Sequence, residues 1–323
     1  MYHRIFFGLA ISLLLCSVIA PARAQWIPTS GPNGGTIWTI ASNGTNLYAG
    51  TTNGLFVSID NGITWKLSGN GLVNPDIRSF AAIDTDLFVG TDGSGVFRST
   101  DNGTNWVSAS KGLPLIIGVS CFAAISTGSP LPVIFIATDS GVYRSLNNGT
   151  SWALSGLYSY DIATFSVIGT NIIAGDGIGD SHGGGAFLSK DLGITWTRAG
   201  LDTLGVSSFV LIGASPLTST IFAGTYLGGA FYATLSDTNW TQINTGLLDA
   251  ATQPNITSLA INGTTIYAGA SAGGVVVSSN NGALWDPITL NAGLPLGMVS
   301  ALAVNNGFLF AAMDTTIWRR PIP

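Results

Sequence analysis

The chain carries the octapeptide Ser58-Ile59-Asp60-Asn61-Gly62-Ile63-Thr64-Trp65, and it repeats this pattern at intervals. Further copies end at Trp106, Trp152, Trp196 and Trp285, and a degenerate copy ends at Trp240, where Leu235 and Asp237 replace the first Asp and the Gly. Successive Trp residues of these copies lie 41, 46, 44, 44 and 45 positions apart. A period of this length predicts that each unit is one supersecondary element of a repeat fold.

Each residue type of the pattern has a role in a tight turn. The Asp or Asn side chain accepts hydrogen bonds from backbone N–H groups, Gly supplies the positive φ, and Trp offers a large apolar face as the next strand begins. We therefore expect the copies to stabilise hairpins rather than to act in catalysis. Their structural residues are Asp60, Gly62, Trp65, Asp101, Gly103, Trp106, Asn147, Gly149, Trp152, Asp191, Gly193, Trp196, Asn280, Gly282 and Trp285.

The pattern resembles the Asp-box, or BNR, repeat of sialidases, some endoglucanases, sortilin-type receptors and photosystem II assembly-factor-like proteins. This resemblance covers nearly all of the chain after residue 24, and it implies a β-propeller whose boxes lie between the third and fourth strands of each blade. It does not imply sialidase activity, since the same box occurs in many proteins that are not enzymes.

The residues between the boxes predict an all-β fold with seven units of four short strands. The first unit is expected at Ile37–Ser42, Leu47–Gly50, Leu55–Ser58 and Thr64–Leu67, whereas the seventh supplies only three strands. The segment Gln25–Gly31 resembles the fourth strand of the first unit, so we expect it to complete blade seven and close the ring. The prediction is a single seven-bladed β-propeller of four-stranded antiparallel blades over residues 25–323.

The first 24 residues predict a secretory signal peptide. A basic start at Met1–Arg4 precedes an apolar run, Ile5–Ala20, that is too short for a bilayer span, and Ala22-Arg23-Ala24 resembles a cleavage site. We expect a secreted or periplasmic protein with no membrane span after cleavage. The remaining chain has nine Lys and Arg against sixteen Asp and no Glu, about −7, which argues against a nucleic-acid partner. Its one cysteine, Cys121, is expected to be a buried apolar side chain.

One ring of loops is a candidate ion site. The connections between the second and third strands place matching residues around one mouth of the propeller, and four of them are carboxylates: Asp92, Asp139, Asp176 and Asp314. Several oxygens suit Ca²⁺, but Thr-Asp-Gly and Thr-Asp-Ser sequences are also good turn formers. We favour turns and expect no cofactor.

The fourth unit departs from the others. Its loop Asp176–Gly185 is several residues longer than its counterparts and holds His182, the only histidine after residue 24. Tyrosines beside carboxylates suit a sugar or a peptide, whereas a solvated glycine loop with rim tyrosines needs no ligand. Arg78, the only cation at seven equivalent first-strand positions, is expected to pair with Asp92 rather than to face an anionic ligand. The candidate ligand-binding residues are Tyr158, Tyr160, Asp161, Asp176, Asp180, His182, Tyr226 and Arg78.

The possible functions differ in the catalytic residues that they require, and the composition of the chain can be compared with each requirement. A sialidase mechanism uses a Tyr–Glu pair and an arginine triad, but the chain has no Glu, and Arg98, Arg144 and Arg319 resemble repeat features. An inverting glycosidase needs two carboxyls, for which Asp161 with Asp176 or Asp180 is the available pair. We interpret the chain as a non-catalytic propeller that binds a protein segment or a glycan through its loops. The alternatives are a glycoside hydrolase-like enzyme and a structural or assembly module without a small ligand.

Overall fold

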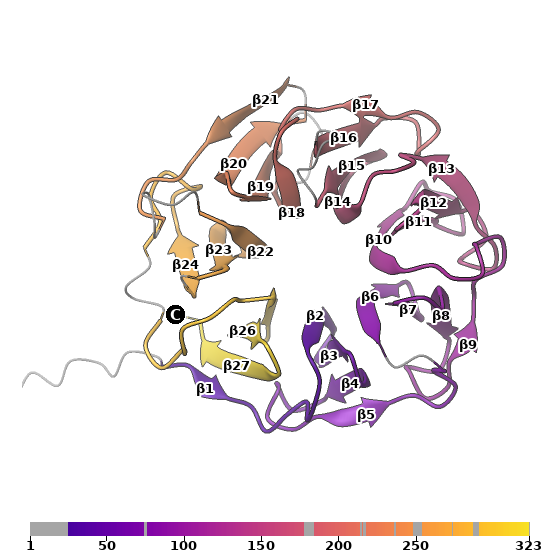
Figure 1. Ribbon diagram of the computed structural model, residues 1–323, viewed down its shortest axis with the longest axis horizontal. Coiled ribbons are helices and arrows are strands. Elements are labelled where there is room, and N and C mark those ends of the chain that lie inside the picture. Colours follow the sequence, from indigo (N-terminus) through magenta and orange to yellow (C-terminus); the bar gives the residue numbers. More distant parts are fainter. Residues whose placement is uncertain are drawn as a thin grey trace, which may run out of the picture.

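Seven small antiparallel sheets surround a central opening, in the arrangement of a propeller (Figure 1). The computed structural model describes residues 25–73, 76–177, 184–213, 215, 218–235, 237–247, 254–272, 274–286 and 291–322. All regular elements among these residues are strands, and none of the described segments is a helix long and apolar enough to cross a membrane. The predicted fold class is confirmed.

The strands follow one another from the inside of each blade to its outside. Blades one and two comprise β2 (Ile37–Asn43), β3 (Asn46–Thr51), β4 (Gly54–Ser58), β5 (Lys66–Ser68), β6 (Ile77–Ile83), β7 (Asp86–Thr91), β8 (Val96–Ser99) and β9 (Val107–Ser108). Blades three and four comprise β10 (Val119–Ile125), β11 (Val133–Thr138), β12 (Gly141–Ser145), β13 (Ala153–Gly156), β14 (Ile162–Ile168), β15 (Asn171–Asp176), β16 (Gly185–Ser189) and β17 (Thr197–Arg198).

The last three blades keep this order with two variations. Blade five comprises β18 (Gly205–Ile212), β19 (Thr220–Tyr226), β20 (Gly229–Thr234) and β21 (Asp237–Gln242). Blade six shows β22 (Ile256–Asn262), β23 (Thr265–Ala270) and β24 (Val275–Ser278), and a single bridge from Val277 to Asp286 stands where a fourth strand was expected. Blade seven comprises β25 (Ala301–Asn305), β26 (Phe308–Met313), β27 (Thr316–Pro321) and β1 (Ile27–Pro28).

The N-terminal segment closes the ring as the sequence predicts. Strand β1 pairs with β27 through Ile27↔Arg319 and Pro28↔Trp318, so the two ends of the described chain share blade seven (Figure 1). Trp26 is 1% exposed and belongs to a core cluster with Tyr267 of blade six. Its backbone N–H also donates to the carbonyl of Ala292, at 3.0 Å. The first segment therefore joins blade six to blade seven.

The Asp boxes are hairpin turns held by their own side chains. In the first box, Asp60 Oδ1 accepts the N–H of Thr64 at 2.9 Å and the hydroxyl of Ser58 at 2.8 Å. The Ser58 Oγ in turn accepts the N–H of Gly62 at 2.8 Å. The expectation that the strand begins at Thr64 is wrong, because these bonds keep Thr64 in the turn and β5 starts at Lys66. The predicted turn role of the box is confirmed.

In four blades the Trp of the box also ties the blade to the preceding one. The indole N–H of Trp152 donates to the carbonyl of Ala109 in blade two, at 2.7 Å. Trp196, Trp240 and Trp285 make the same bond to the blade before them, at 2.9, 2.6 and 2.7 Å. The degenerate box keeps its Trp240 and so keeps this contact. Our assignment of Trp to apolar packing alone was therefore incomplete, because the indole N–H is a structural hydrogen-bond donor.

The carboxylates of three boxes have depressed pKa values. Partial burial acts to raise the pKa of Asp60, but hydrogen bonds from Thr64 and Ser58 outweigh it, and the pKa falls from 3.8 to about 2. Hydrogen bonds from Asn105 lower the pKa of Asp101 to about 2, and those from Thr195 do the same for Asp191. Since the folded pKa lies below the unfolded value, these groups stabilise the fold above about pH 4 and lose that effect as the pH falls to about 2.

A triple variant tests this acid sensitivity. Replacing Asp60, Asp101 and Asp191 by Asn should make the melting temperature fall less between about pH 5 and pH 2 than in the parent chain. The amide can take the place of the carboxylate, because Asn147 Oδ1 accepts the N–H of Ser151 at 2.9 Å in its own box. Circular dichroism melts over this pH range provide the measurement. Parallel curves for parent and variant would show that the boxes do not set acid stability.

Candidate functional site

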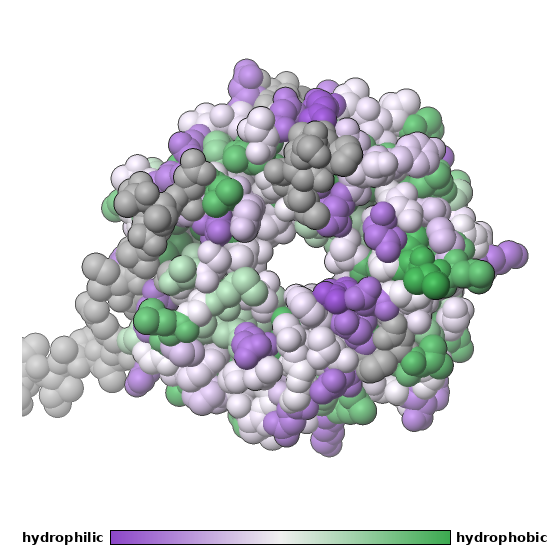
Figure 2. Space-filling model, viewed as in Figure 1, coloured by the Kyte–Doolittle hydropathy of each residue, from purple (hydrophilic) through white to green (hydrophobic). Residues whose placement is uncertain are grey.

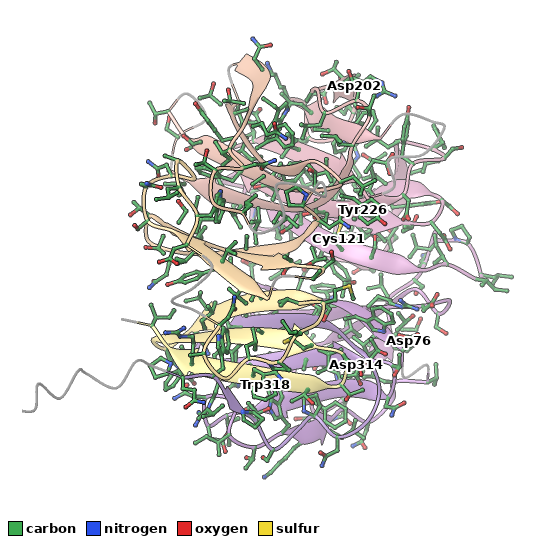
Figure 3. The ribbon with its side chains drawn as sticks, turned by 60° about the vertical axis from the view of Figure 1, so that its left-hand side comes forward. Asp76, Cys121, Asp202, Tyr226, Asp314 and Trp318 are labelled. Carbon is green, nitrogen blue, oxygen red and sulfur yellow. The ribbon has the colours of Figure 1, made fainter. Side chains whose placement is uncertain are left out.

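One face of the propeller carries the variable connections. It holds the turns from the second to the third strand of each blade and the longer links from one blade to the next, and we call it the loop face. The Asp-box turns lie at the opposite strand ends. Figure 3 labels four residues that lie at or next to these connections: Asp76, Asp202, Tyr226 and Asp314. The loop face is therefore where the blades differ most from one another.

Tyr158 and Tyr160 lie in a groove between the outer parts of blades three and four. The groove has a volume of about 410 Å³. It is lined by Ser155, Gly156, Leu157, Tyr158, Tyr160, Phe187, Ile194, Trp196 and Arg198, and we call it the Tyr160 groove. Tyr158 is 63% exposed, so its ring is available to a ligand.

A cation and two aromatic rings form one side of this groove. The Tyr160 ring lies 4.6 Å from the ring of Phe187, and the Arg198 guanidinium lies 5.3 Å from the Phe187 ring. Arg198 Nη2 donates to the Tyr160 hydroxyl at 3.3 Å, and Nη1 pairs with Asp202 at 3.1 Å. The hydrogen bond with Asp202 raises the pKa of Arg198, which stays charged. Ring faces next to a fixed donor suit a peptide or a sugar.

The two carboxylates proposed for catalysis lie at the inner end of blade four. Asp176 ends β15 opposite Ile162, and the N–H of Gly177 donates to the carbonyl of Asp161 at 2.8 Å. Asp161 is exposed, whereas Asp176 is buried. The pair therefore combines one exposed and one buried carboxyl. Asp180 and His182 lie outside the described residues.

The remaining tyrosine of the candidate set lies on a different blade. Tyr226 ends β19 of blade five and pairs with Gly205, and its side chain is 56% exposed. The candidate residues thus divide into the groove tyrosines, the inner carboxylates and Tyr226. Sequence reasoning missed Arg198 and Phe187, because nothing in the repeat pattern shows that Tyr160 turns outward toward blade four.

Arg78 makes the predicted ion pair and two further contacts. Its Nη2 lies 2.6 Å from Asp92 and 3.2 Å from Asp76, and its guanidinium stacks at 4.0 Å on the ring of Trp38. The predicted pairing with Asp92 is confirmed. The stack was not foreseen, although Trp38 and Arg78 occupy equivalent positions of adjacent units.

The equivalent positions in other blades have a shared structural role. They lie near the start of the first strand, at β-bulges in blades three, five and six. In these three blades and in blade seven a hydroxyl donates to a carbonyl at the start of the next blade, whereas blade four has Ala163. These hydroxyls belong to Ser120, Ser207, Thr257 and Ser300, and their acceptors are Ile162, Ile256, Val299 and Ile37. At blade two Arg78 occupies the bulge, and Ser79 makes the bond to Val119 at 2.8 Å instead.

The ring of loop carboxylates is engaged in local contacts. Asp92 pairs with Arg78, Asp139 accepts the N–H of Gly118 at 3.2 Å, and Asp314 has a φ of 52° in its turn. Across the described residues, no group of three or more His, Cys, Asp and Glu side chains could hold a metal ion. Cys121 is a free thiol that packs against the core of blades three and four, and burial raises the pKa of this thiol.

The comparisons with known proteins agree with the repeat and the fold. Residues 56–67 match the sequence family described as the BNR/Asp-box repeat. No curated protein sequence matches the chain. Among solved structures, "YCF48 bound to D1 peptide" is similar with a TM-score of 0.71 and 15% identity over 94% of this chain and 98% of that one.

Two larger proteins contain a similar propeller. The extracellular domain of BT4673 from B. thetaiotaomicron superposes with a TM-score of 0.68 and 15–16% identity, covering 92% of this chain and about 40% of that one. The GH74 enzyme of Niastella koreensis superposes with a TM-score of 0.65 and 14% identity, covering 92% of this chain and 53% of that one. At these identities the likeness is one of fold, and this chain spans about half or less of both larger proteins.

Proposed function

We propose that this Asp-box β-propeller is an exported binding protein that holds a segment of another protein on its loop face without catalysing a reaction. The signal-peptide pattern of residues 1–24 supports export, as does the extracellular setting of the BT4673 propeller. The peptide bound by YCF48 supports the ligand class, since it shows that a propeller of this shape accepts a protein segment.

The observation that carries the proposal is the Tyr160 groove. Tyr158 presents an exposed ring at the groove, while Tyr160 is held in place by Phe187 and Arg198. A rigid ring loses little conformational entropy on binding, and one fixed guanidinium can donate to a peptide carbonyl. Loops on a rigid scaffold are the usual place for such contacts. The groove therefore combines apolar area with directional hydrogen bonding.

Truncating the two groove tyrosines tests this function. In a peptide and glycan array, the Tyr158→Ala/Tyr160→Ala variant should bind a ligand of the parent chain about tenfold or more weakly, because buried aromatic anchors dominate such interfaces. The melting temperature should change little for Tyr158→Ala alone, since that side chain is exposed. Fluorescence anisotropy with each array hit gives the affinities.

Tyr226→Ala is the matched control, because Tyr226 is a similarly exposed tyrosine of the loop face on another blade. The Tyr226→Ala variant should bind each array hit with the same affinity as the parent chain. Loss of binding with Tyr226→Ala but not with the groove variant would move the site to blade five. If only glycans on the array bind, the ligand class would be a sugar and not a protein segment.

A further inference from the structure

A second surface of the loop face lies between the central opening and the outer rim of blades one to three. It comprises Trp38, Asp76, Arg78, Asp92 and Asp139, with Leu115 and Ile116 farther out, and we call it the channel-mouth surface. Figure 2 shows hydrophilic side chains beside the opening and a hydrophobic patch outside them, near the link between β9 and β10. No residue of this surface lines the Tyr160 groove.

The parts of this surface are in contact with one another. A Cβ at Gly118 would lie 3.6 Å from Asp139 Oδ2 and 3.7 Å from Asp92 Oδ1, so the two carboxylates flank one glycine. A Cβ at Gly93 would lie 3.9 Å from Ile116 Cγ2, which places that side chain next to the Asp92 turn. The carboxylates and the apolar loop thus form one continuous surface.

The charge of the surface is unbalanced. Three carboxylates, Asp76, Asp92 and Asp139, face a single guanidinium, that of Arg78, which pairs with the first two. The four side chains together carry two negative charges. Lys111, in the same link, lies at its outer end, where its carbonyl accepts the N–H of Trp152 at 2.9 Å.

The apolar part of the surface projects into solvent. Leu115 is 99% exposed and Ile116 is 83% exposed, and they are adjacent in the chain. Neither side chain packs on the blades, so neither contributes to the core. A pair of fully projecting aliphatic side chains beside unbalanced carboxylates is typical of a protein contact in which apolar anchors lie next to a polar rim.

The Trp38–Arg78 stack indicates that this sector departs from the repeat for a reason other than packing. In four other blades the same position holds a hydroxyl that bonds to the next blade. Here two adjacent copies give up that role and form a stack, with Trp38 Nε1 and Arg78 Nε buried and without a hydrogen-bond partner among the described residues. Positions that break a repeat's own rule are expected at functional surfaces.

We propose that the channel-mouth surface docks a cationic protein segment that carries apolar side chains. Lysine or arginine side chains of the segment bind Asp92 and Asp139, and its apolar side chains pack on Leu115 and Ile116. Charge complementarity favours this occupant, because Asp76, Asp92, Asp139 and Arg78 together carry a formal net charge of −2 and the whole chain has a formal charge of −5. The inference rests on the proposed function in one respect, that the loop face binds protein segments, but it uses a different sector.

The probes are three short synthetic peptides, one of Lys and Leu, one of Glu and Leu, and one of Lys and Ser. The Lys/Leu peptide is expected to bind the full chain, and raising NaCl from roughly 50 to 300 mM should weaken it several-fold. The Glu/Leu peptide should not bind, and the Lys/Ser peptide should bind about tenfold more weakly because it lacks apolar anchors. Equal binding of the Glu/Leu peptide, or no binding of the Lys/Leu peptide, overturns the proposal.

Two double variants locate the contact. Leu115→Ser/Ile116→Ser and Asp92→Asn/Asp139→Asn should each weaken the Lys/Leu peptide about tenfold. The Asn variants keep acceptors for Arg78 and for the N–H of Gly118. Leu146→Ser and Asp84→Asn are matched controls on the Asp-box face, where Leu146 is 64% exposed, and they should leave binding unchanged.

The outcomes separate the two proposals. Equal losses in the control variants would mean that the peptide binds an acidic protein without a defined site, and this inference would be wrong. If binding of the Lys/Leu peptide is weakened only by substitutions of Tyr158 and Tyr160, the Tyr160 groove is the binding site and the proposal for the channel-mouth surface is wrong. Dependence on Leu115, Ile116, Asp92 and Asp139 alone would do the reverse.

Discussion

Deleting residues 25–31 is expected to cause the largest loss of stability of any change considered for this chain. The deletion removes β1, which is the outer strand of blade seven, and it removes Trp26 from the core between blades six and seven. It also leaves the edge of β27 unpaired. An unpaired edge strand pairs readily with another molecule, so the shortened chain should aggregate on heating.

The size of the effect can be bounded with a single substitution. Trp26→Ala should cost about 3–5 kcal/mol, the range for a buried aromatic side chain, because Trp26 is only 1% exposed. The deletion should cost at least as much, since it removes the strand pairing as well. Thermal melts and light scattering of the parent chain, Trp26→Ala and the deletion variant provide the measurement.

Ile27→Ala is the matched control for this closure. Ile27 belongs to the same strand but is 45% exposed, so its truncation should cost less than about 1 kcal/mol. A deletion variant that melts within a degree or two of the parent chain would show that the ring is closed by other contacts.

Gly149→Ala is expected to be a strongly destabilising substitution within a box. Gly149 has a φ of 74°, and a Cβ there would lie 2.5 Å from Cε1 of Phe88 in the preceding blade. The positive φ costs an L-residue about 1–2 kcal/mol, and forcing a methyl group against a packed ring costs a further 1–3 kcal/mol or so. Chemical denaturation should therefore show a loss of roughly 2–5 kcal/mol.

Gly44→Ala separates the two causes. Gly44 has a φ of 59° in the turn between β2 and β3, and a Cβ there would have no atom within 4 Å. Its substitution should show only the backbone cost, about 1 kcal/mol. Equal losses for the two variants would mean that the close approach of the box to Phe88 does not contribute to stability.

The sequence predicted the fold because the repeat encodes it locally. Asp60, Gly62 and Trp65 specify one turn, and the interval between boxes leaves room for four strands. The closure by Gln25–Gly31 was also predictable, since that segment repeats the fourth strand of blade one and the last unit lacks one. These inferences need only the order of residues along the chain.

The binding surfaces could be predicted only in part, because they depend on where side chains point after the blades are assembled. Tyr158 and Tyr160 were identified from their residue type, but their partners Phe187 and Arg198 come from the following blade. Tyr226 lies on blade five, as its position in the sequence predicts, but it does not line the Tyr160 groove. Leu115 and Ile116 gave no sequence signal, since exposed and buried aliphatic residues look alike in a β-rich chain.

The hydroxyl of Ser79 has an evolutionary consequence. It bonds to the carbonyl of Val119 and so joins blade two to blade three without any help from the neighbouring position. Position 78 is therefore released from holding the seam and can accumulate substitutions without opening the ring. In the blades where Ser120, Ser207 or Thr257 makes the bond, the same position is constrained. Natural variants of this protein should therefore be able to change residue 78 without opening the ring, and they would then lose the stack on Trp38 and the ion pairs with Asp76 and Asp92.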